Sequence, residues 1–157
     1  MLIRPATIDD VAGIAALVQR YWECESVEGF ERPRVETLLG ALLAEPDRGA
    51  CWVAETEGGL CGYLLAAFMF SLEHGGSMAE IDELFVSGEM RSSGVGALLL
   101  ARAEDELAQR GLVRLQLQVG VANQRARNFY ARHGFRRRAG YELLDKPLPC
   151  LKAEAPR

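Results

Sequence analysis

A short glycine-bearing loop between an extended run and a helical run constrains this chain more than any other feature. The extended run, residues 79–86, ends in Leu84-Phe85-Val86, and the loop after it reads Arg91-Ser92-Ser93-Gly94-Val95-Gly96. Glycine allows positive φ and close approach to an anion, while the first N–H groups of the next helix point at the charge. The stretch predicts a pyrophosphate-binding loop after a strand that carries three carboxylates: Glu80, Asp82 and Glu83.

Two common phosphate-binding loops do not fit this stretch. A P-loop requires Lys and then Ser or Thr after its last glycine, whereas Gly96 is followed by Ala97 and Leu98. A dinucleotide-binding fingerprint requires a third glycine three residues after the second, and Leu99 occupies that position. The sequence therefore excludes both of these nucleotide-binding motifs.

A second motif lies between Asn123 and Phe135. It follows the pattern Asn-x-x-Ala-x-x-Phe-Tyr and is completed by Gly134-Phe135. Together with Arg-x-x-Gly-x-Gly after a Leu-Phe-Val strand, this motif resembles the GNAT superfamily of N-acetyltransferases. The opening Ile3-Arg4-Pro5-Ala6-Thr7, with Asp10, is similar to the first strand and helix start of that superfamily. The resemblance extends in order over nearly the whole chain.

The resemblance implies an α/β (α+β) fold in a single domain, residues 1–157. Its central sheet would be mixed but mostly antiparallel, with about six to seven strands between about four helices on its two faces. Splayed strands would form the acyl-CoA cleft. Hydrophobic periodicity predicts helices over residues 8–20, 35–45, 96–110 and 123–133, with Thr7 as an N-cap. Extended runs predict strands at the N-terminus and over residues 50–57, 60–70, 79–86, 112–119 and 141–148.

Length and composition limit the class of protein. A chain of 157 residues is one domain by length and can bury a substantial core. It has no apolar run long enough for a membrane span and no signal segment, so we expect a cytoplasmic protein without a membrane partner. A net charge of −4 argues against nucleic acid as a partner. The four cysteines form no Cys-x-x-Cys pair, so we expect no metal site.

Three carboxylates compete for the role of catalytic base. Acetyl transfer from a thioester to an amine needs a neutral nucleophile, a donor for the oxyanion and a proton for the departing thiolate. Alternation along a strand predicts Glu80 and Asp82 on one face with Leu84, and Glu83 on the other face. A β-bulge would reverse this parity and bring Glu83 inward. A water relay, or a general attraction of cationic substrate by these charges, remains an alternative.

The resemblance implies further roles for individual residues. Glu80 aligns with the catalytic glutamate of the superfamily's histone acetyltransferases, and Asp82 with the proposed base of the spermidine/spermine acetyltransferases. Tyr130 would supply a proton or hydrogen bond to the leaving thiolate. The N–H of Leu84 would meet the thioester oxygen. The implied acetyl-CoA-binding residues are Leu84, Phe85, Val86, Arg91, Ser92, Ser93, Gly94, Val95, Gly96, Asn123 and Tyr130.

The acceptor site of the family lies under the loop after the first helix, here residues 21–30. Its rings and carboxylates suit a cationic amine through charge and cation–π contacts. The candidates are Tyr21, Trp22, Glu25, Glu28 and Phe30, with His74 at the substrate mouth. The spermidine/spermine and diamine enzymes have Trp before the helix Asn. This chain has Ala122 there, which argues against a polyamine acceptor.

We therefore expect an acetyl-CoA-dependent N-acetyltransferase that acetylates a primary amine on a small cationic molecule. A non-catalytic acyl-CoA-binding or regulatory module is one alternative, and a peptide or ribosomal-protein N-acetyltransferase is another. The carboxylate strand and Tyr130 favour the enzyme, because a binding module needs neither. The sequence leaves a homodimer open.

Overall fold

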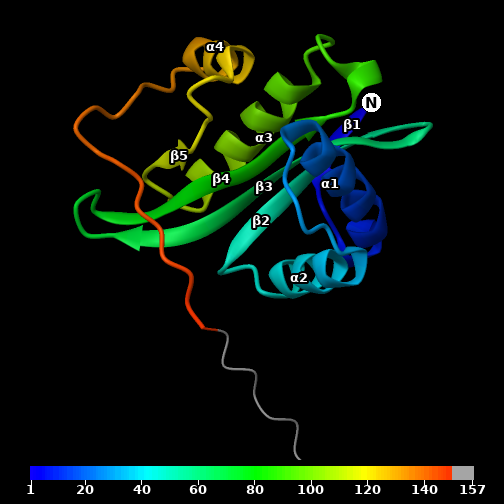
Figure 1. Ribbon diagram of the computed structural model, residues 1–157, viewed down its shortest axis with the longest axis horizontal. Coiled ribbons are helices and arrows are strands. Elements are labelled where there is room, and N and C mark those ends of the chain that lie inside the picture. The colour runs from blue at the N-terminus through cyan, green and yellow to red at the C-terminus, as the bar shows by residue number, and fades with distance from the viewer. Residues whose placement is uncertain (150–157) are drawn as a thin grey trace, which may run out of the picture.

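The computed structural model describes residues 1–149 of the chain (Figure 1). Within them one sheet has five strands in the order β1-β2-β3-β4-β5. These are β1 (Leu2–Pro5), β2 (Gly49–Thr56), β3 (Gly59–Ser71), β4 (Gly76–Val86) and β5 (Leu115–Leu117). The first four strands are antiparallel, and β5 runs parallel to β4. The helices are α1 (Val11–Glu25), α2 (Arg32–Ala44), α3 (Val95–Gln109) and α4 (Gln124–Arg132), with short 3-10 turns η1 (Ile8–Asp10) and η2 (Gly88–Met90).

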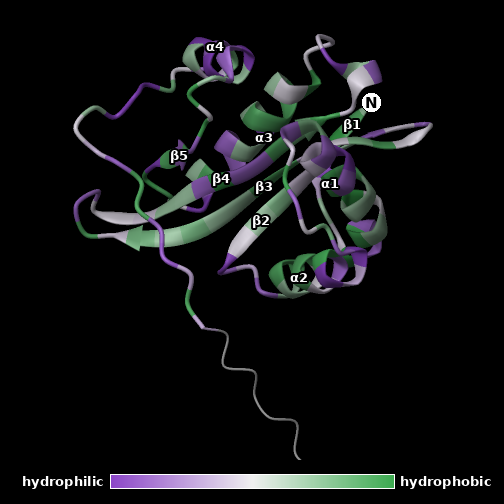
Figure 2. Cartoon of the chain, in the orientation of Figure 1, coloured by the Kyte–Doolittle hydropathy of each residue, from purple (hydrophilic) through white to green (hydrophobic). Residues whose placement is uncertain are grey.

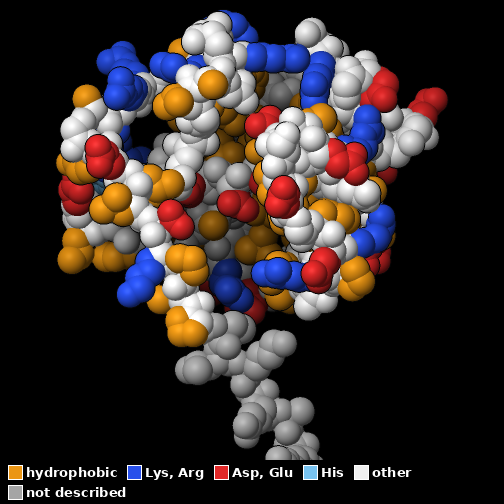
Figure 3. All heavy atoms as spheres, in the orientation of Figure 1, with side chains coloured by type: hydrophobic (Ala, Val, Ile, Leu, Met, Phe, Trp, Pro, Cys, Tyr) orange, Lys and Arg blue, Asp and Glu red, His pale blue; other side chains and the backbone are white. Residues whose placement is uncertain are grey.

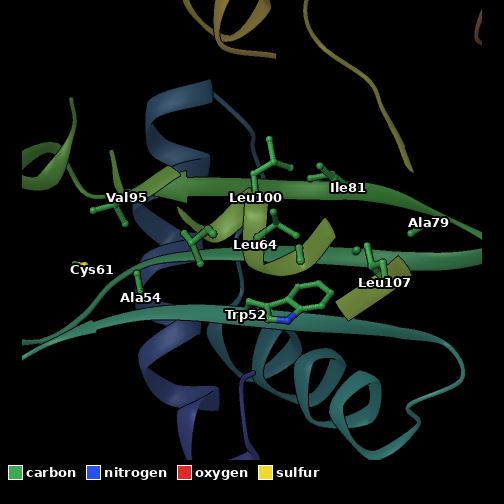
Figure 4. Close-up of a cluster of buried hydrophobic side chains, with 12 residues drawn as sticks. Trp52, Ala54, Cys61, Leu64, Ala79, Ile81, Val95, Leu100 and Leu107 are labelled. Carbon is green, nitrogen blue, oxygen red and sulfur yellow. The ribbon is translucent and has the colours of Figure 1, made fainter. Parts of the chain in front are cut away.

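Helices cover both faces of the sheet, and each face has its own core. Side chains along β2 alternate between the two cores, because successive residues of a strand point to opposite faces. Trp52 and Ala54 pack in the core that α3 covers, whereas Val53 packs in the core that α1 and α2 cover. Figure 4 shows the first of these cores, and Figure 2 shows the hydrophobic character of the central strands. The sheet thus lies between two helical layers (Figure 1).

The predicted α+β architecture of the GNAT type is confirmed, but the sheet has five strands where about six to seven were expected. Residues 141–148, predicted as the last strand, form none. Pro147 lacks the N–H that a strand ladder requires, and Leu143, Leu144 and Leu148 are exposed. The strand predicted over residues 112–119 is reduced to the three residues of β5.

Two helix boundaries also differ from the prediction. Helix α1 continues to Glu25, so Tyr21 and Trp22 lie on a helix and not in a loop. Helix α2 begins at Arg32 with Pro33 in its first turn, where a missing N–H breaks no helical hydrogen bond. Thr7 is the N-cap residue of the turn η1, as predicted, and its side chain takes part in a capping box with Asp10. The Thr7 hydroxyl donates to the Asp10 carboxylate, which also accepts the Thr7 N–H.

A β-bulge in β4 changes which carboxylates share a face. Glu83 pairs with Leu65 and Ile81 pairs with Ala66, so Asp82 has no partner on β3. Ile81 and Leu84 pack toward α3, and Glu80 and Glu83 both lie on the α1–α2 side. The predicted grouping of Glu80 with Asp82 and Leu84 is therefore wrong, and the bulge considered as an alternative is present.

The carboxylate of Asp10, at the start of α1, forms an ion pair with Arg4 on β1. It accepts hydrogen bonds from the Arg4 guanidinium at 2.7 and 2.9 Å, and this pairing lowers its pKa to about 2. A carboxyl group whose pKa is lower in the folded state stabilises that state at pH values above its unfolded-state pKa. This contribution is lost as the pH falls through the folded-state pKa. We expect Asp10→Asn to lower the unfolding free energy by about 1–3 kcal/mol at neutral pH.

Urea unfolding at several pH values checks this expectation. The difference between wild type and Asp10→Asn should shrink as the pH falls from about 4 to about 2, where wild-type Asp10 becomes protonated. A difference that stays constant over this range would contradict an ion-pair origin.

Candidate active site

A cleft of about 550 Å³ opens where β4 and β5 separate. β5 pairs only with Ala79, Glu80 and Ile81 of β4, so the later residues of β4 have no β5 partner. Side chains and backbone from β4, the glycine loop, α4 and the end of α1 line the space between them. Among the predicted acetyl-CoA-binding residues, the cleft is lined by Leu84, Phe85, Val86, Arg91, Ser92, Gly94, Val95, Gly96, Asn123 and Tyr130. The predicted splayed strands are thus present.

The glycine loop, residues 91–96, places the start of α3 at this cleft. Gly94 is the residue before the helix and has φ of 85°, a left-handed conformation that favours glycine. No side chain caps α3, so its first N–H groups are free for an anion. A Cβ on Gly96 would lie 3.6 Å from the Phe129 ring, an ordinary contact distance, so α4 packs close to the loop at this point. Ser93 is the exception in the loop, because its hydroxyl donates to the Met90 carbonyl and it does not line the cleft.

Arg91 places a cation at the mouth of the cleft. Its guanidinium donates to the Val86 carbonyl at 3.2 Å and to the Cys24 sulfur at 3.7 Å, and it lies 5.6 Å from the Phe85 ring centroid. These contacts join the loop to the end of α1. The positive charge beside the helix N-terminus suits a phosphate group.

Helix α4 brings Asn123 and Tyr130 to the same cleft. The Asn123 side chain caps the helix by accepting the Ala126 N–H at 3.1 Å. Tyr130 packs edge-to-face against Phe129 and Phe135. Burial raises the pKa of Tyr130 to about 12, so its hydroxyl keeps a proton at neutral pH and can donate it.

A second cavity, of about 500 Å³, lies between α1, α2 and the sheet. Its walls are mainly apolar, with Trp22 and the carboxylates of Glu28, Glu31 and Glu83 among them. Asp82, the bulge residue, lines both cavities and is the one residue that they share. Figure 3 shows acidic side chains gathered around the hollowed centre of one face of the molecule.

The three β4 carboxylates have different surroundings. Asp82 is open to both cavities, and partial burial together with repulsion from Glu80 raises its pKa. Burial also raises the pKa of Glu83, although hydrogen bonds from Tyr63 and Trp22 oppose the rise. Glu80 lies where β4 pairs with β5, and its carboxylate accepts hydrogen bonds from the side-chain amides of Gln116 and Gln118. It lines neither cavity. Asp82 alone combines a raised pKa with access to both spaces.

The predicted acceptor residues do not form one group. Tyr21 and Glu25 line the cleft beside β4, whereas Trp22 and Glu28 line the second cavity. Phe30 packs edge-to-face against Trp22 and lines neither cavity. The structure does not bring His74 to either cavity, because it lies at the turn between β3 and β4 and contacts Arg138.

Sequence reasoning missed residues whose position depends on pairing between distant segments. Tyr63 lies inside β3 and reads as an ordinary core residue, yet its hydroxyl contacts Glu83. Cys24 lines the cleft without any motif that marks it. The spacing between Trp22 and Glu83 carries no local signal either.

Residues 14–135 match the Acetyltransferase (GNAT) family. The chain belongs to the GNAT family. Its mixed sheet, splayed strands and glycine loop agree with this assignment, and the chain is an N-acetyltransferase that uses acetyl-CoA.

Several relatives of this GNAT protein cover most of its length. An uncharacterized N-acetyltransferase of Archaeoglobus fulgidus is 33% identical over 87% of this chain and 94% of its own. The aminoalkylphosphonate N-acetyltransferase of Salmonella typhimurium is 29% identical, over 85% of this chain and 84% of its own.

Solved structures share the fold. An integron cassette protein from the mobile metagenome of Cole Harbour Salt Marsh has a TM-score of 0.82 and 26% identity, covering 94% of this chain and 90% of its own. A "predicted acetyltransferase with acetyl-CoA" from Clostridium acetobutylicum has a TM-score of 0.78 and 18% identity, covering 92% and 95% of the two chains.

Within residues 1–149, no helix is both long and apolar enough to cross a membrane. The same described part contains no cluster of three or more His, Cys, Asp or Glu residues that could hold a metal ion.

Proposed function

We propose that this GNAT protein transfers an acetyl group directly from acetyl-CoA to the primary amine of a small cationic molecule. One observation carries the proposal: the cleft that ends in the glycine loop and the cavity under α1 and α2 share one lining residue, the carboxylate Asp82. A transferase with two substrates needs two spaces that meet at the reacting atoms. The meeting point here is a group that can accept a proton.

The cleft suits acetyl-CoA. The pyrophosphate would lie on the first N–H groups of α3, close to Gly94 and Gly96. Arg91 would neutralise part of its charge. The pantetheine arm would follow the edge of β4 that β5 leaves open, past Val86 and Leu84, so that the thioester reaches Asp82 and Tyr130.

The reaction then needs two proton transfers. The amine nitrogen attacks the thioester carbonyl carbon, and Asp82 accepts a proton from that amine, directly or through one water. A backbone N–H of β4, that of Leu84, stabilises the oxyanion. When the carbon–sulfur bond breaks, Tyr130 donates a proton or hydrogen bond to the thiolate.

The second cavity supports a small acceptor with an aliphatic body. Its apolar walls include Val35, Leu39 and Leu65. Four carboxylates and two guanidinium groups also line it, so negative charge is in excess. This balance attracts a protonated amine. Arg34 and Arg48 on the same cavity would also suit an acidic group, so aminoalkylphosphonates, the substrates named for the Salmonella typhimurium relative, belong in a substrate panel.

Release of free CoA over a panel of amines tests the proposal. The panel should contain diamines, aminoalkylphosphonates, amino acids and short peptides with a free amino terminus. Turnover of small amines supports the proposal. Turnover of peptides alone would favour a peptide N-acetyltransferase, and tight acetyl-CoA binding without turnover of any amine would favour a binding module.

Tyr130→Phe separates the enzyme from the binding module. The ring and its packing against Phe129 and Phe135 remain, so the fold and the acetyl-CoA affinity should survive. The hydroxyl acts mainly in the transition state, where charge builds on sulfur, so we expect kcat to fall about 10- to 1,000-fold with little change in KM. Steady-state kinetics with any accepted amine measures this, and wild-type turnover by the variant would remove Tyr130 from the mechanism.

A further inference from the structure

Glu83 is held by two aromatic side chains from distant parts of the chain. The Trp22 indole N–H donates to one carboxylate oxygen at 2.7 Å, and the Tyr63 hydroxyl donates to the other at 2.6 Å. Tyr63 is fully buried, and within residues 1–149 every buried side-chain nitrogen and oxygen has a hydrogen-bond partner. We call this group of three residues, Glu83, Trp22 and Tyr63, the carboxylate clamp.

The clamp joins the elements that shape the second cavity. Trp22 lies in the last turns of α1, Tyr63 lies on β3, and Glu83 lies on β4. Phe30, from the segment between α1 and α2, packs edge-to-face on Trp22 with ring centroids 5.8 Å apart. The clamp therefore attaches α1 and the segment after it to the strand that carries Asp82.

Glu83 also directly follows the bulge. Asp82 has no partner on β3, so the ladder alone does not fix its direction. The next residue, Glu83, is fixed by its pairing with Leu65 and by two hydrogen bonds to its side chain. Holding Glu83 on the α1–α2 side thus sets the direction in which Asp82 leaves the strand.

We infer that Glu83 is a positioning residue: through the carboxylate clamp it fixes the bulge that aims Asp82 at the junction of the two cavities. This inference rests on the proposed function and adds to it. It assigns the second carboxylate of the strand to geometry and leaves the proton transfer to Asp82. Each donor occupies one oxygen of the Glu83 carboxylate, so neither oxygen is left free to take a proton from substrate, although burial raises the pKa of this group.

A pair of substitutions separates position from charge. In Glu83→Gln the amide oxygen can accept from Trp22, and the amide N–H can donate to the Tyr63 oxygen, because a phenol both donates and accepts. Glu83→Gln thus keeps both contacts without the charge, whereas Glu83→Ala removes them. We expect kcat of Glu83→Gln to stay within about threefold of wild type, with any lost attraction for a cationic amine seen in KM, and kcat of Glu83→Ala to fall about 10- to 100-fold, the range for groups that orient a catalytic residue.

Two further variants and a matched control complete the series. Tyr63→Phe removes one donor and keeps the ring, whereas Trp22→Phe removes the other donor and replaces the indole by a smaller phenyl ring. Each should lower kcat by less than Glu83→Ala. Glu106 accepts the Trp52 indole N–H at 2.8 Å on the α3 side of the sheet, so Glu106→Gln makes the same replacement away from both cavities. Glu106→Gln should leave kcat/KM unchanged. The rise in Tm with acetyl-CoA shows that each variant is folded.

The possible results decide between the roles. Equal losses of 10²–10⁴ in Glu83→Gln and Glu83→Ala would overturn the inference, because they are expected of a general base. Wild-type kinetics in Glu83→Ala would overturn it as well. If the wild type acetylates no amine, the proposed function fails, and the Trp22 indole N–H resonance still tests the clamp. That proton should be protected from exchange in wild type and Glu83→Gln but not in Glu83→Ala, and equal exchange in all three would refute the clamp.

Discussion

Replacing Gly94 by Asp should abolish acetyl-CoA binding and leave the protein folded. The new carboxylate would stand at the N-terminus of α3, where the free N–H groups are expected to hold the pyrophosphate, and it would repel that group. A ligand at one hundred times its Kd stabilises a protein by about 2.7 kcal/mol, so wild type should show a clear rise in Tm with acetyl-CoA. The variant should show none.

Gly111 offers a matched control at the opposite end of the same helix. It has φ of 80°, close to the 85° of Gly94, and a Cβ on either residue meets nothing within 4 Å. Gly111→Asp therefore introduces the same side chain and a similar backbone strain, which lowers Tm without touching the cleft. It should keep the full rise in Tm with acetyl-CoA. A full rise in Gly94→Asp as well would refute the pyrophosphate site.

The parts of the site that could be predicted from the sequence are local. The loop from Arg91 to Gly96 and the Asn123 cap are short patterns in which chemistry and backbone conformation are set by neighbouring residues. All four helices were predicted for the same reason, with errors mainly at their ends. At these positions local preference and tertiary structure agree.

The parts that could not be predicted depend on pairing between distant segments. Strict alternation places Glu80 and Glu83 on opposite faces, and a single unpaired residue at Asp82 places them on the same face. Nothing in the sequence near Asp82 marks the bulge. The contact between Trp22 and Glu83 likewise depends on how α1 packs on the sheet, and α1 itself extends further than its apolar pattern indicated.

The strand predicted over residues 141–148 is wrong for a different reason: its side-chain pattern is present, but the strand does not form. Residues 141–148 include apolar residues typical of a strand, but a strand also requires a neighbour and N–H groups to pair with it. Pro147 supplies no N–H, and Arg138 instead stacks over the Tyr141 ring with 4.0 Å to its centroid. A pattern of side chains therefore predicts a strand only where the backbone can be paired.

Asp82→Asn should lower kcat by about 10²–10⁴, the range for one general acid–base contribution. The amide keeps the size of the side chain at the junction of the two cavities but cannot accept the proton that the attacking amine must lose. Glu80→Gln is the matched comparison on the same strand, because Glu80 contacts Gln116 and Gln118 and lines neither cavity. Its kcat should stay within about threefold of wild type.

The pH dependence of kcat/KM gives a second test of Asp82 as the catalytic base. Burial and the charge of Glu80 raise its pKa above the ordinary aspartate value, and a base is active only when deprotonated. The wild-type kcat/KM should therefore fall as the pH drops through this raised pKa, and the acidic limb should disappear in Asp82→Asn. If the substitution raises KM for cationic amines and leaves kcat and the acidic limb intact, Asp82 attracts the substrate and water carries the proton. Wild-type kinetics in both strand variants would exclude the β4 carboxylates from the chemistry.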